Sequence, residues 1–411
     1  MAPQYAPSLR SRLAPLLLFL QTAFIIIYAF FVEVDSNVKV DGETFSNFYA
    51  EFQDVNVIVI LGFGFLCTFL VRYGFSGSGF NLLVAVMATQ WAIILNGIES
   101  WYYRGKIRVN LRSLVVAEMC TASVLISMGT MLGKTNPVHL IIIALLEVSG
   151  FIVNEWVLQT LLKVNNCSCV SHSHQILGPS IFTPYTTQCM LYSQGNSPVC
   201  CLYSPGSVFL WMFWPTFNSV LVDDRTPGRK LGAVCSTYLA LAVSAVTAAA
   251  IALLSHPKGK LNLIHMQSCI LAGGVAVGVS MSAVHQPWEA MTIGFSAAII
   301  STIGFQYLKI HMLLAFQCHD TCATLSTHGL PGLLGWLSHL LLQIRDSDDH
   351  TMAIRFAVFH ICTLLITITI SLSTGFVTGL LLKWNFWRPP QSKKCFDDQA
   401  FWEFPHNAVR K

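Results

Sequence analysis

The sequence has few charged residues. Of its 411 residues only 11% are Asp, Glu, Lys or Arg, whereas 54% are hydrophobic. A soluble globular domain carries roughly 25% charged residues. So small a share excludes an ordinary soluble protein and predicts an integral membrane protein that contacts membrane lipid over much of its surface.

Several kinds of functional site are also missing. The basic residues are scattered among loops and form no stripe, so no nucleic acid is expected as a partner. No nucleophile, base and orienting group occur together, so the chain is not expected to be an enzyme, and no cofactor is expected. The glycine-rich stretch Leu271–Gly278 lacks the spacing of a phosphate loop and fits helix packing instead. The 13 cysteines form no disulfide framework, because five of them lie inside apolar runs: Cys67, Cys120, Cys235, Cys269 and Cys362.

Long apolar runs are abundant. A helix needs about 20 mostly apolar residues to cross a bilayer, and ten runs qualify, with a shorter eleventh over 208–222. They predict an all-α, polytopic transmembrane helical bundle of about 11–12 spans. Residues 1–382 would form the membrane domain and 383–411 a cytosolic C-terminal tail. The runs cover 13–32, 55–71, 80–95, 114–132, 138–161, 208–222, 231–254, 265–284, 288–308, 328–344 and 352–382.

Residues 165–207 have a composition unlike the rest of the chain. They contain no window apolar enough to span a membrane, and they are rich in serine, proline and tyrosine. We interpret them as an atypical inserted or substituted segment. The alternative is a metal site, but the usual zinc spacing is missing from its candidate ligands, which are Cys167, Cys169, His172 and His174.

The distribution of positive charge indicates how many spans to expect. Cytosolic loops carry an excess of Lys and Arg. With a cytosolic N-terminus, eleven spans would place Lys258, Lys260 and the basic tail outside. One more span between 163 and 208 would place these basic residues in the cytosol instead. The second half of the chain therefore fits a twelve-span protein with both termini in the cytosol.

Five motifs closely resemble the Rh proteins, of the blood-group polypeptide and Rh-associated glycoprotein type, in the ammonium transporter superfamily. The resemblance covers nearly the whole chain except 165–207. It implies a trimer of twelve-helix subunits in the plasma membrane, either a homotrimer or a heterotrimer with other Rh-type subunits, with a pore in each subunit. The motifs are GKTNPVHLIIIALLEVSGFIVNEWVLQTLLK (133–163), FLWMFWPTFNS (209–219), GKLNLIHMQSCILAGGVAVG (259–278), HDTC followed by HGLPG (319–332) and CFDDQAFWEFPHNAV (395–409).

The resemblance also implies pore-lining residues. His328 matches the second pore histidine, in the HG that opens a helix, and Phe217 matches one of two gate phenylalanines. Met119 stands where the family has the other. Histidine suits a pore for ammonia, because one ring nitrogen can donate while the other accepts. The alternatives are a histidine hydrated at the membrane boundary and ordinary aromatic packing of Phe217. The family's first pore histidine, in a Gly-Ser-Met-Thr-Ile-His helix, has no counterpart.

Two functions follow. The first is ammonium/ammonia transport through a subunit pore, with methylammonium or carbon dioxide as further substrates to consider. The alternative is a non-conducting structural subunit of an Rh complex, linked to the cytoskeleton by an adaptor. The tail and the acidic first outer loop (Glu33–Asp54), which lacks a glycosylation sequon, favour the alternative, whereas His328 favours transport. Glu147, Asn154 and Glu155 share one apolar run, and polar residues in a span are often functional. The alternative for Asn154 and Glu155 is a place at an interface.

Overall fold

The computed structural model describes most of the membrane domain. The described residues are 9–35, 45–66, 74–133, 135–162, 206–222, 228–256, 269–308, 322–347 and 349–384, with short pieces at 183–184, 186–187, 258–261, 266–267, 311–312, 314, 320, 387, 398 and 401–402.

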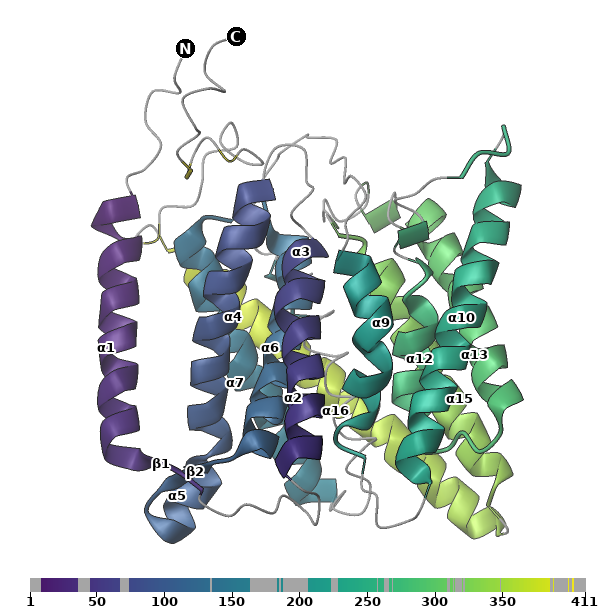
Figure 1. Ribbon diagram of the computed structural model, residues 1–411, viewed down its shortest axis with the longest axis horizontal. Helices are drawn as coiled ribbons and strands as arrows, with labels where there is room; N and C mark the ends of the chain where they lie inside the picture. The colour runs from purple at the N-terminus through teal and green to yellow at the C-terminus, as the bar shows by residue number, and fades with distance from the viewer. Residues whose placement is uncertain are drawn as a thin grey trace.

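The described chain is a bundle of helices that run side by side, as Figure 1 shows. This confirms the predicted all-α membrane fold. The first group comprises η1 (Leu9–Ser11), α1 (Leu13–Phe31), α2 (Phe45–Val57), η2 (Ile58–Phe63), α3 (Gly64–Leu66), α4 (Gly74–Asn96), α5 (Ile98–Arg104), α6 (Leu111–Met131) and α7 (Pro137–Leu162). The second comprises α9 (Gly206–Ser219), α10 (Arg229–Ser255), α12 (Ala272–Ser280), α13 (Pro287–Ile303), η3 (Gly304–Leu308), η4 (Leu325–Gly329), α15 (Leu330–Arg345) and α16 (His350–Leu382).

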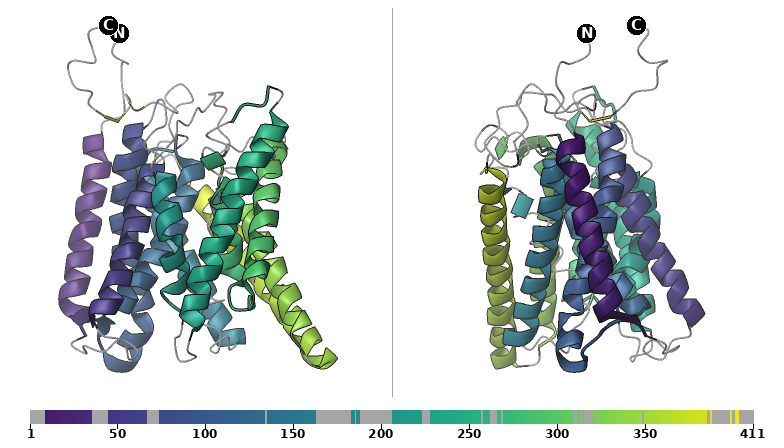
Figure 2. Two further views of the ribbon diagram at one scale, coloured as in Figure 1. Left: turned by 45° about the vertical axis from the view of Figure 1, so that its right-hand side comes forward. Right: turned by 90° about the vertical axis from the view of Figure 1, so that its left-hand side faces the viewer.

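Seven of the described helices are long and apolar enough to cross a membrane. Among the described residues, α9 and α12 are shorter than the predicted spans, with 14 and 9 residues. The helix η4 leads directly into α15, so that span is longer than predicted. These helices lie in the second group, where α12 contacts α9, α10, α13 and α15. The helix α16 runs obliquely and contacts both α15 and α7, so it ties the two groups together (Figures 1 and 2).

Small residues allow close packing in the second group. A side chain at Gly273 or Gly294 would collide with the backbone of Ala240, and one at Gly335 with the backbone of Ala276. Helices in membranes approach one another closely where the contact residues are small. The glycine-rich stretch of α12 therefore serves helix packing, as its sequence indicates.

A short two-stranded parallel sheet closes one end of the bundle. It pairs β1 (Val32–Val34) with β2 (Ile107–Val109). Across it, Arg108 Nε lies 3.2 Å from Glu33 Oε1, and Lys106 Nζ donates to the Phe30 carbonyl at 2.6 Å. These contacts fasten the end of α1 to the chain that enters α6.

The helix α2 begins earlier than the apolar run predicts. The sequence predicts that Glu51 and Asp54 lie at the end of an acidic loop, but in the structure both residues are helical. Lys230 Nζ lies 2.6 Å from Glu51 Oε1, and the Thr216 hydroxyl donates to Asp54 Oδ2 at 3.0 Å. Partners from α10 and α9 therefore make these acidic positions compatible with a packed helix.

The described tail residues bind the protein's own α4. The Asp398 carboxylate accepts hydrogen bonds from the backbone N–H groups of Phe75, at 2.7 Å, and Ser76, at 2.9 Å. Trp402 Nε1 donates to Ser76 Oγ at 2.9 Å, and its ring centroid lies 5.0 Å from that of Phe80. A carboxylate at a helix N-terminus satisfies free N–H groups and the helix dipole, so Asp398 anchors this part of the tail.

Candidate pore site

The helix that carries His328 begins with a side-chain cap. The Asp320 carboxylate accepts from the backbone N–H groups of Thr324, at 2.7 Å, and Leu325, at 3.0 Å. The preceding Ala323 has a φ of 56°, in the left-handed region that a residue with a side chain adopts at a cost. His328 therefore lies in the second turn of the helix, and the prediction that it opens the helix was wrong. The capping side chain extends the helix beyond the apolar run.

Aromatic rings from two other helices surround His328, which is 5% exposed. The Trp214 ring of α9 stacks on it, with centroids 6.1 Å apart and planes inclined by 22°. The Phe63 ring of η2 lies 6.3 Å away. Trp214 also lies 6.0 Å from the Phe217 ring. The second ring beside Phe217 thus comes from its own helix, three residues earlier.

Polar atoms without partners lie at and beside this cluster. Within the described part of the chain, Trp214 Nε1 and Thr327 Oγ1 are buried and make no hydrogen bond. Buried polar atoms in proteins are nearly always bonded to protein or water. The indole N–H and the hydroxyl are therefore available to a water molecule or to a small polar solute.

The end of α9 that carries Phe217 is held in place by its neighbour Asn218. The Asn218 side-chain amide donates to the Gly274 carbonyl at 3.1 Å and to Thr237 Oγ1 at 3.2 Å. Phe217 itself is 7% exposed and belongs to the main hydrophobic core. These bonds to α12 and α10 fix the direction in which the ring points.

Met119 lies on α6, is 4% exposed and belongs to the same hydrophobic core as Phe217. It supplies no ring, so the second gate phenylalanine that the resemblance implies is missing from this position. Neither Trp214 nor Phe63 is among the residues predicted from the sequence. Trp214 could have been found, since it lies three residues before Phe217 on the same helix. Phe63 had no local signal, because only packing brings η2 to this place.

The candidate metal ligands Cys167, Cys169, His172 and His174 lie outside the described residues. Three threonines of the atypical segment are described: Thr183, Thr186 and Thr187. The hydroxyl groups of two of them donate to carbonyls of α16, from Thr183 to Ser371 at 3.2 Å and from Thr187 to Gly375 at 3.1 Å. Among the described residues, no three His, Cys, Asp or Glu side chains are placed to hold a metal ion.

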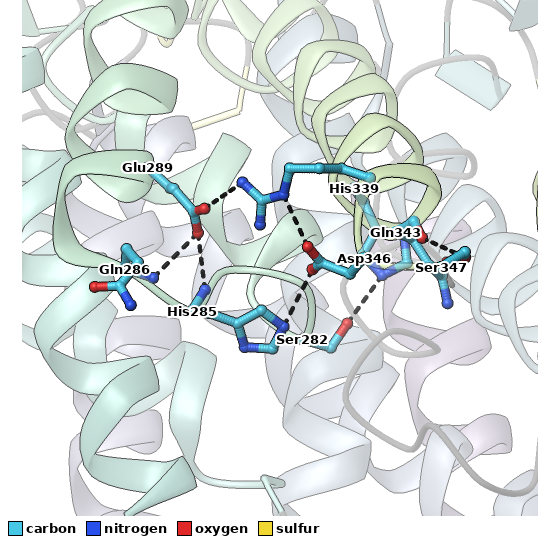
Figure 3. A network of polar contacts seen from close by, with 9 residues as sticks. Ser282, His285, Gln286, Glu289, His339, Gln343, Asp346 and Ser347 are labelled. Carbon is cyan, nitrogen blue, oxygen red and sulfur yellow. Dashed lines mark hydrogen bonds and ion pairs between the residues drawn. The ribbon is translucent and has the colours of Figure 1, made fainter. Parts of the chain in front are cut away.

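A second polar group lies where α12 leads to α13 and where α15 ends (Figure 3). Glu289 accepts from the backbone N–H groups of His285, at 2.9 Å, and Gln286, at 3.1 Å, and from Arg345 Nη1 at 2.5 Å. Arg345 Nε also donates to Asp346 Oδ1 at 2.8 Å, and His285 Nε2 lies 3.3 Å from Asp346 Oδ2. The bond from Arg345 holds the pKa of the Asp346 carboxyl below its ordinary value. This network joins the ends of three helices.

Known proteins match this chain over nearly its whole length. The model of the Ammonium Transporter Family matches residues 16–162 and 192–387. The chain is 35% identical over 434 residues to Ammonium transporter Rh type B of Danio rerio, covering 97% of this chain and 94% of the relative. It is 37% identical over 426 residues to an RH-like protein of Macaca mulatta, with full coverage of both.

The fold is also shared with solved structures. The structure of Nitrosomonas europaea Rh50, of the Rhesus protein family of channels, superposes with a TM-score of 0.76 at 25% identity, covering 88% of this chain and 94% of that chain. Saccharomyces cerevisiae Mep2 superposes with a TM-score of 0.65 at 14% identity, covering 87% and 92%. The resemblance to the Rh proteins is thereby confirmed. This multi-pass membrane chain belongs to the Ammonium Transporter Family.

Proposed function

We propose that this chain conducts ammonia through a pore lined by His328, Phe217 and Met119. Ammonium/ammonia transport is the function of its family, and the relatives of type A, B and C are named ammonium transporters. The observation that carries the assignment of the pore is the buried His328 ring, held between the rings of Trp214 and Phe63.

The aromatic cluster would separate ammonium from ammonia. Aromatic faces attract a cation, so ammonium can gather beside Phe217 and Trp214. A bare cation in the middle of a bilayer is costly by several kcal/mol, whereas neutral ammonia avoids most of this cost. His328 can donate to the ammonia lone pair or accept from its N–H groups, because a neutral imidazole has one nitrogen of each kind.

The substrate would be small and able to form hydrogen bonds. Methylammonium also offers N–H groups but has a methyl group in place of one hydrogen, whereas carbon dioxide has no hydrogen to donate to His328. Transport of ammonia should therefore depend on His328, while passage of carbon dioxide should not. This contrast distinguishes the candidate substrates.

The assembly we propose is a homotrimer or heterotrimer of Rh-type subunits in the plasma membrane, with both termini cytosolic. Residues 1–382 would form the membrane domain, 165–207 an atypical segment within it, and 383–411 the cytosolic tail. A cytoskeletal adaptor would bind parts of that tail that Asp398 and Trp402 leave accessible.

A non-conducting structural subunit is the second candidate. It is favoured by the sequence, which contains no Gly-Ser-Met-Thr-Ile-His helix and has Met119 in place of a gate phenylalanine. Such a subunit would keep the scaffold and its tail contacts without passing ammonia.

The test is ammonia entry into proteoliposomes that contain the full chain and a fluorescent pH indicator. An inward ammonia gradient should raise the internal pH faster than in protein-free liposomes. His328→Ala should remove the increment, whereas His350→Ala, at an exposed position, should keep it. Equal rates for wild-type protein and protein-free liposomes would support the structural subunit.

A further inference from the structure

Three ionisable side chains lie at intervals of eight residues along α7: His139, Glu147 and Glu155. They are 0%, 1% and 9% exposed. Residues four apart form one ridge of an α-helix, and this ridge turns by about 80° around the helix axis every eight residues. Glu147 therefore lies on a face between those of His139 and Glu155, with Ile143 and Phe151 between the three groups. At 1.5 Å per residue this ridge is about 24 Å long, most of the thickness of a bilayer core. The rings around His328 come from η2 and α9 and not from α7.

The helix α6, which packs against α7, carries buried hydroxyl groups that face the middle of this ridge. The Ser127 hydroxyl donates a short hydrogen bond to Glu147 Oε1. Ser123, Ser127 and Thr130 are all fully buried, and Thr130 Oγ1 donates to the Ser127 carbonyl at 2.8 Å. Since α6 and α7 are consecutive and antiparallel, Thr130 lies about 4.5 Å closer than Ser127 to the level of His139.

The two ends of the ridge also have polar neighbours. At the end of the bundle that carries β1 and β2, Gln159 Nε2 donates to Glu155 Oε1 at 3.0 Å. At the opposite end, the His139 backbone N–H donates to Asn136 Oδ1 at 2.8 Å, and Asn136 Nδ2 donates to the Trp387 carbonyl at 3.2 Å. The ridge therefore carries polar groups at both ends and at its centre, and the buried side chains of Ile143 and Phe151 separate them.

Polar atoms on this ridge are buried without partners. Within the described part of the chain, both ring nitrogens of His139 and Glu147 Oε2 make no hydrogen bond. Asn154 precedes Glu155, and among the described residues its side-chain Oδ1 and Nδ2 also have no hydrogen-bond partner. An unpaired carboxylate in an apolar interior is costly, so Glu147 is expected to hold a proton at rest. Unpartnered buried groups of this kind are suited to contact with internal water.

We propose that the column His139–Glu147–Glu155 conducts protons across the membrane, by a route separate from the pore. Successive groups are about 12 Å apart, so internal water and the hydroxyls of Ser127 and Thr130 would bridge them. Protonated Glu147 gives its proton toward His139 and takes another from the side of Glu155. His139 then releases its proton at the far end, and every group returns to its starting state. Chains of Asp, Glu and His within spans form the proton relays of pumps and transporters.

The experiment uses full-length protein in proteoliposomes without ammonium. A potassium gradient with valinomycin makes the interior negative, and a trapped pH indicator reports proton entry. Wild-type protein should acidify the interior faster than protein-free liposomes do. Glu147→Gln and His139→Gln keep a polar side chain of similar size that cannot pass on a proton. Each should lower this protein-dependent rate by about tenfold or more.

Glu118→Gln is the matched control. Glu118 is also a buried carboxyl with an unpartnered oxygen, and it is 8% exposed. It lies nine residues before Ser127, about 180° around α6, and therefore faces away from Ser127 and its bond to Glu147. Its variant should conduct protons like the wild type. His328→Ala should also conduct protons like the wild type, because the proposed route is separate from the pore. Glu147→Gln should keep the ammonia entry of the wild type, and this result would also show that the variant is folded.

Two results would overturn the proposal. One is wild-type proton entry equal to that of protein-free liposomes, and the other is unchanged proton entry in a Glu147→Gln variant that still transports ammonia. Equal losses in Glu147→Gln and Glu118→Gln would also contradict it, since general damage to the packing would then explain both.

Discussion

The rings of His339 and His360 meet edge to face inside the membrane domain, with centroids 4.5 Å apart and planes inclined by 72°. They join α15 to α16. His360 Nε2 lies 2.5 Å from Gln343 Oε1, and because a carbonyl oxygen only accepts, His360 Nε2 is the donor. His339 Nε2 lies 2.9 Å from Ser282 Oγ, which extends the contact to the end of α12 (Figure 3).

This pair should stabilise the packing of α15 on α16. His360→Phe keeps an aromatic ring but loses the bond to Gln343, so we expect a loss of about 1–3 kcal/mol in the free energy of unfolding. Thermal unfolding in detergent measures it. Ile361→Ala, whose side chain is 46% exposed, is the control and should change the melting temperature much less. A His360→Phe variant as stable as the wild type would contradict a stabilising role.

The Asp320 cap should control how His328 is presented. Asp320→Ala removes the acceptor for two backbone N–H groups, and loss of such a cap costs about 1 kcal/mol. We expect slower ammonia entry together with a lower melting temperature. Asp320→Asn keeps one acceptor oxygen and should restore part of both. If Asp320→Ala lowered stability while ammonia entry stayed unchanged, the cap would serve the fold alone.

The unpartnered indole N–H of Trp214 should act on transport and not on stability. Trp214→Phe keeps a ring beside His328 and breaks no hydrogen bond within the described residues. Unfolding should therefore change little. If this N–H contacts the permeating molecule, ammonia entry should fall by about tenfold, equivalent to about 1.4 kcal/mol in the barrier.

Trp91→Phe is the comparison variant, because the indole N–H of Trp91 is hydrogen-bonded within the protein. Trp91 Nε1 donates to the Leu145 carbonyl at 3.2 Å and to Ser149 Oγ at 3.1 Å, away from His328. This variant should lose about 1–3 kcal/mol of stability and keep its ammonia entry. The same response in both tryptophan variants would argue against a role of Trp214 in the pore.

Stability should depend on pH through Asp346. Its pKa in the folded protein is lowered by the bond from Arg345, so its contribution is present above the unfolded value, about 3.9, and is lost as the pH falls toward the folded value. The melting temperature of the wild type should therefore fall more steeply below about pH 4 than that of Asp346→Asn. Glu99→Gln, at an exposed position, should follow the wild-type curve. Parallel curves for wild type and Asp346→Asn would exclude this linkage.

The class of protein and most of its helices follow from the amino-acid sequence alone. The run predicted over 138–161 became α7, Pro137–Leu162, and the run over 231–254 became α10, Arg229–Ser255. Inside a bilayer no water satisfies the backbone, so a long apolar run must form a helix whatever surrounds it. The assignment to the Rh proteins also needed only local motifs.

The starting points of some helices and the surroundings of His328 depend on tertiary packing. Glu51 lies inside a helix because Lys230 pairs with it, and the helix of His328 starts early because Asp320 folds back on it. Trp214 and Phe63 meet His328 because α9, η2 and η4 converge. Likewise, the eight-residue spacing on α7 is visible in the sequence, but the contact of Glu147 with Ser127 is not. Such contacts join distant parts of the chain, and their geometry depends on how whole helices pack, which no local pattern specifies.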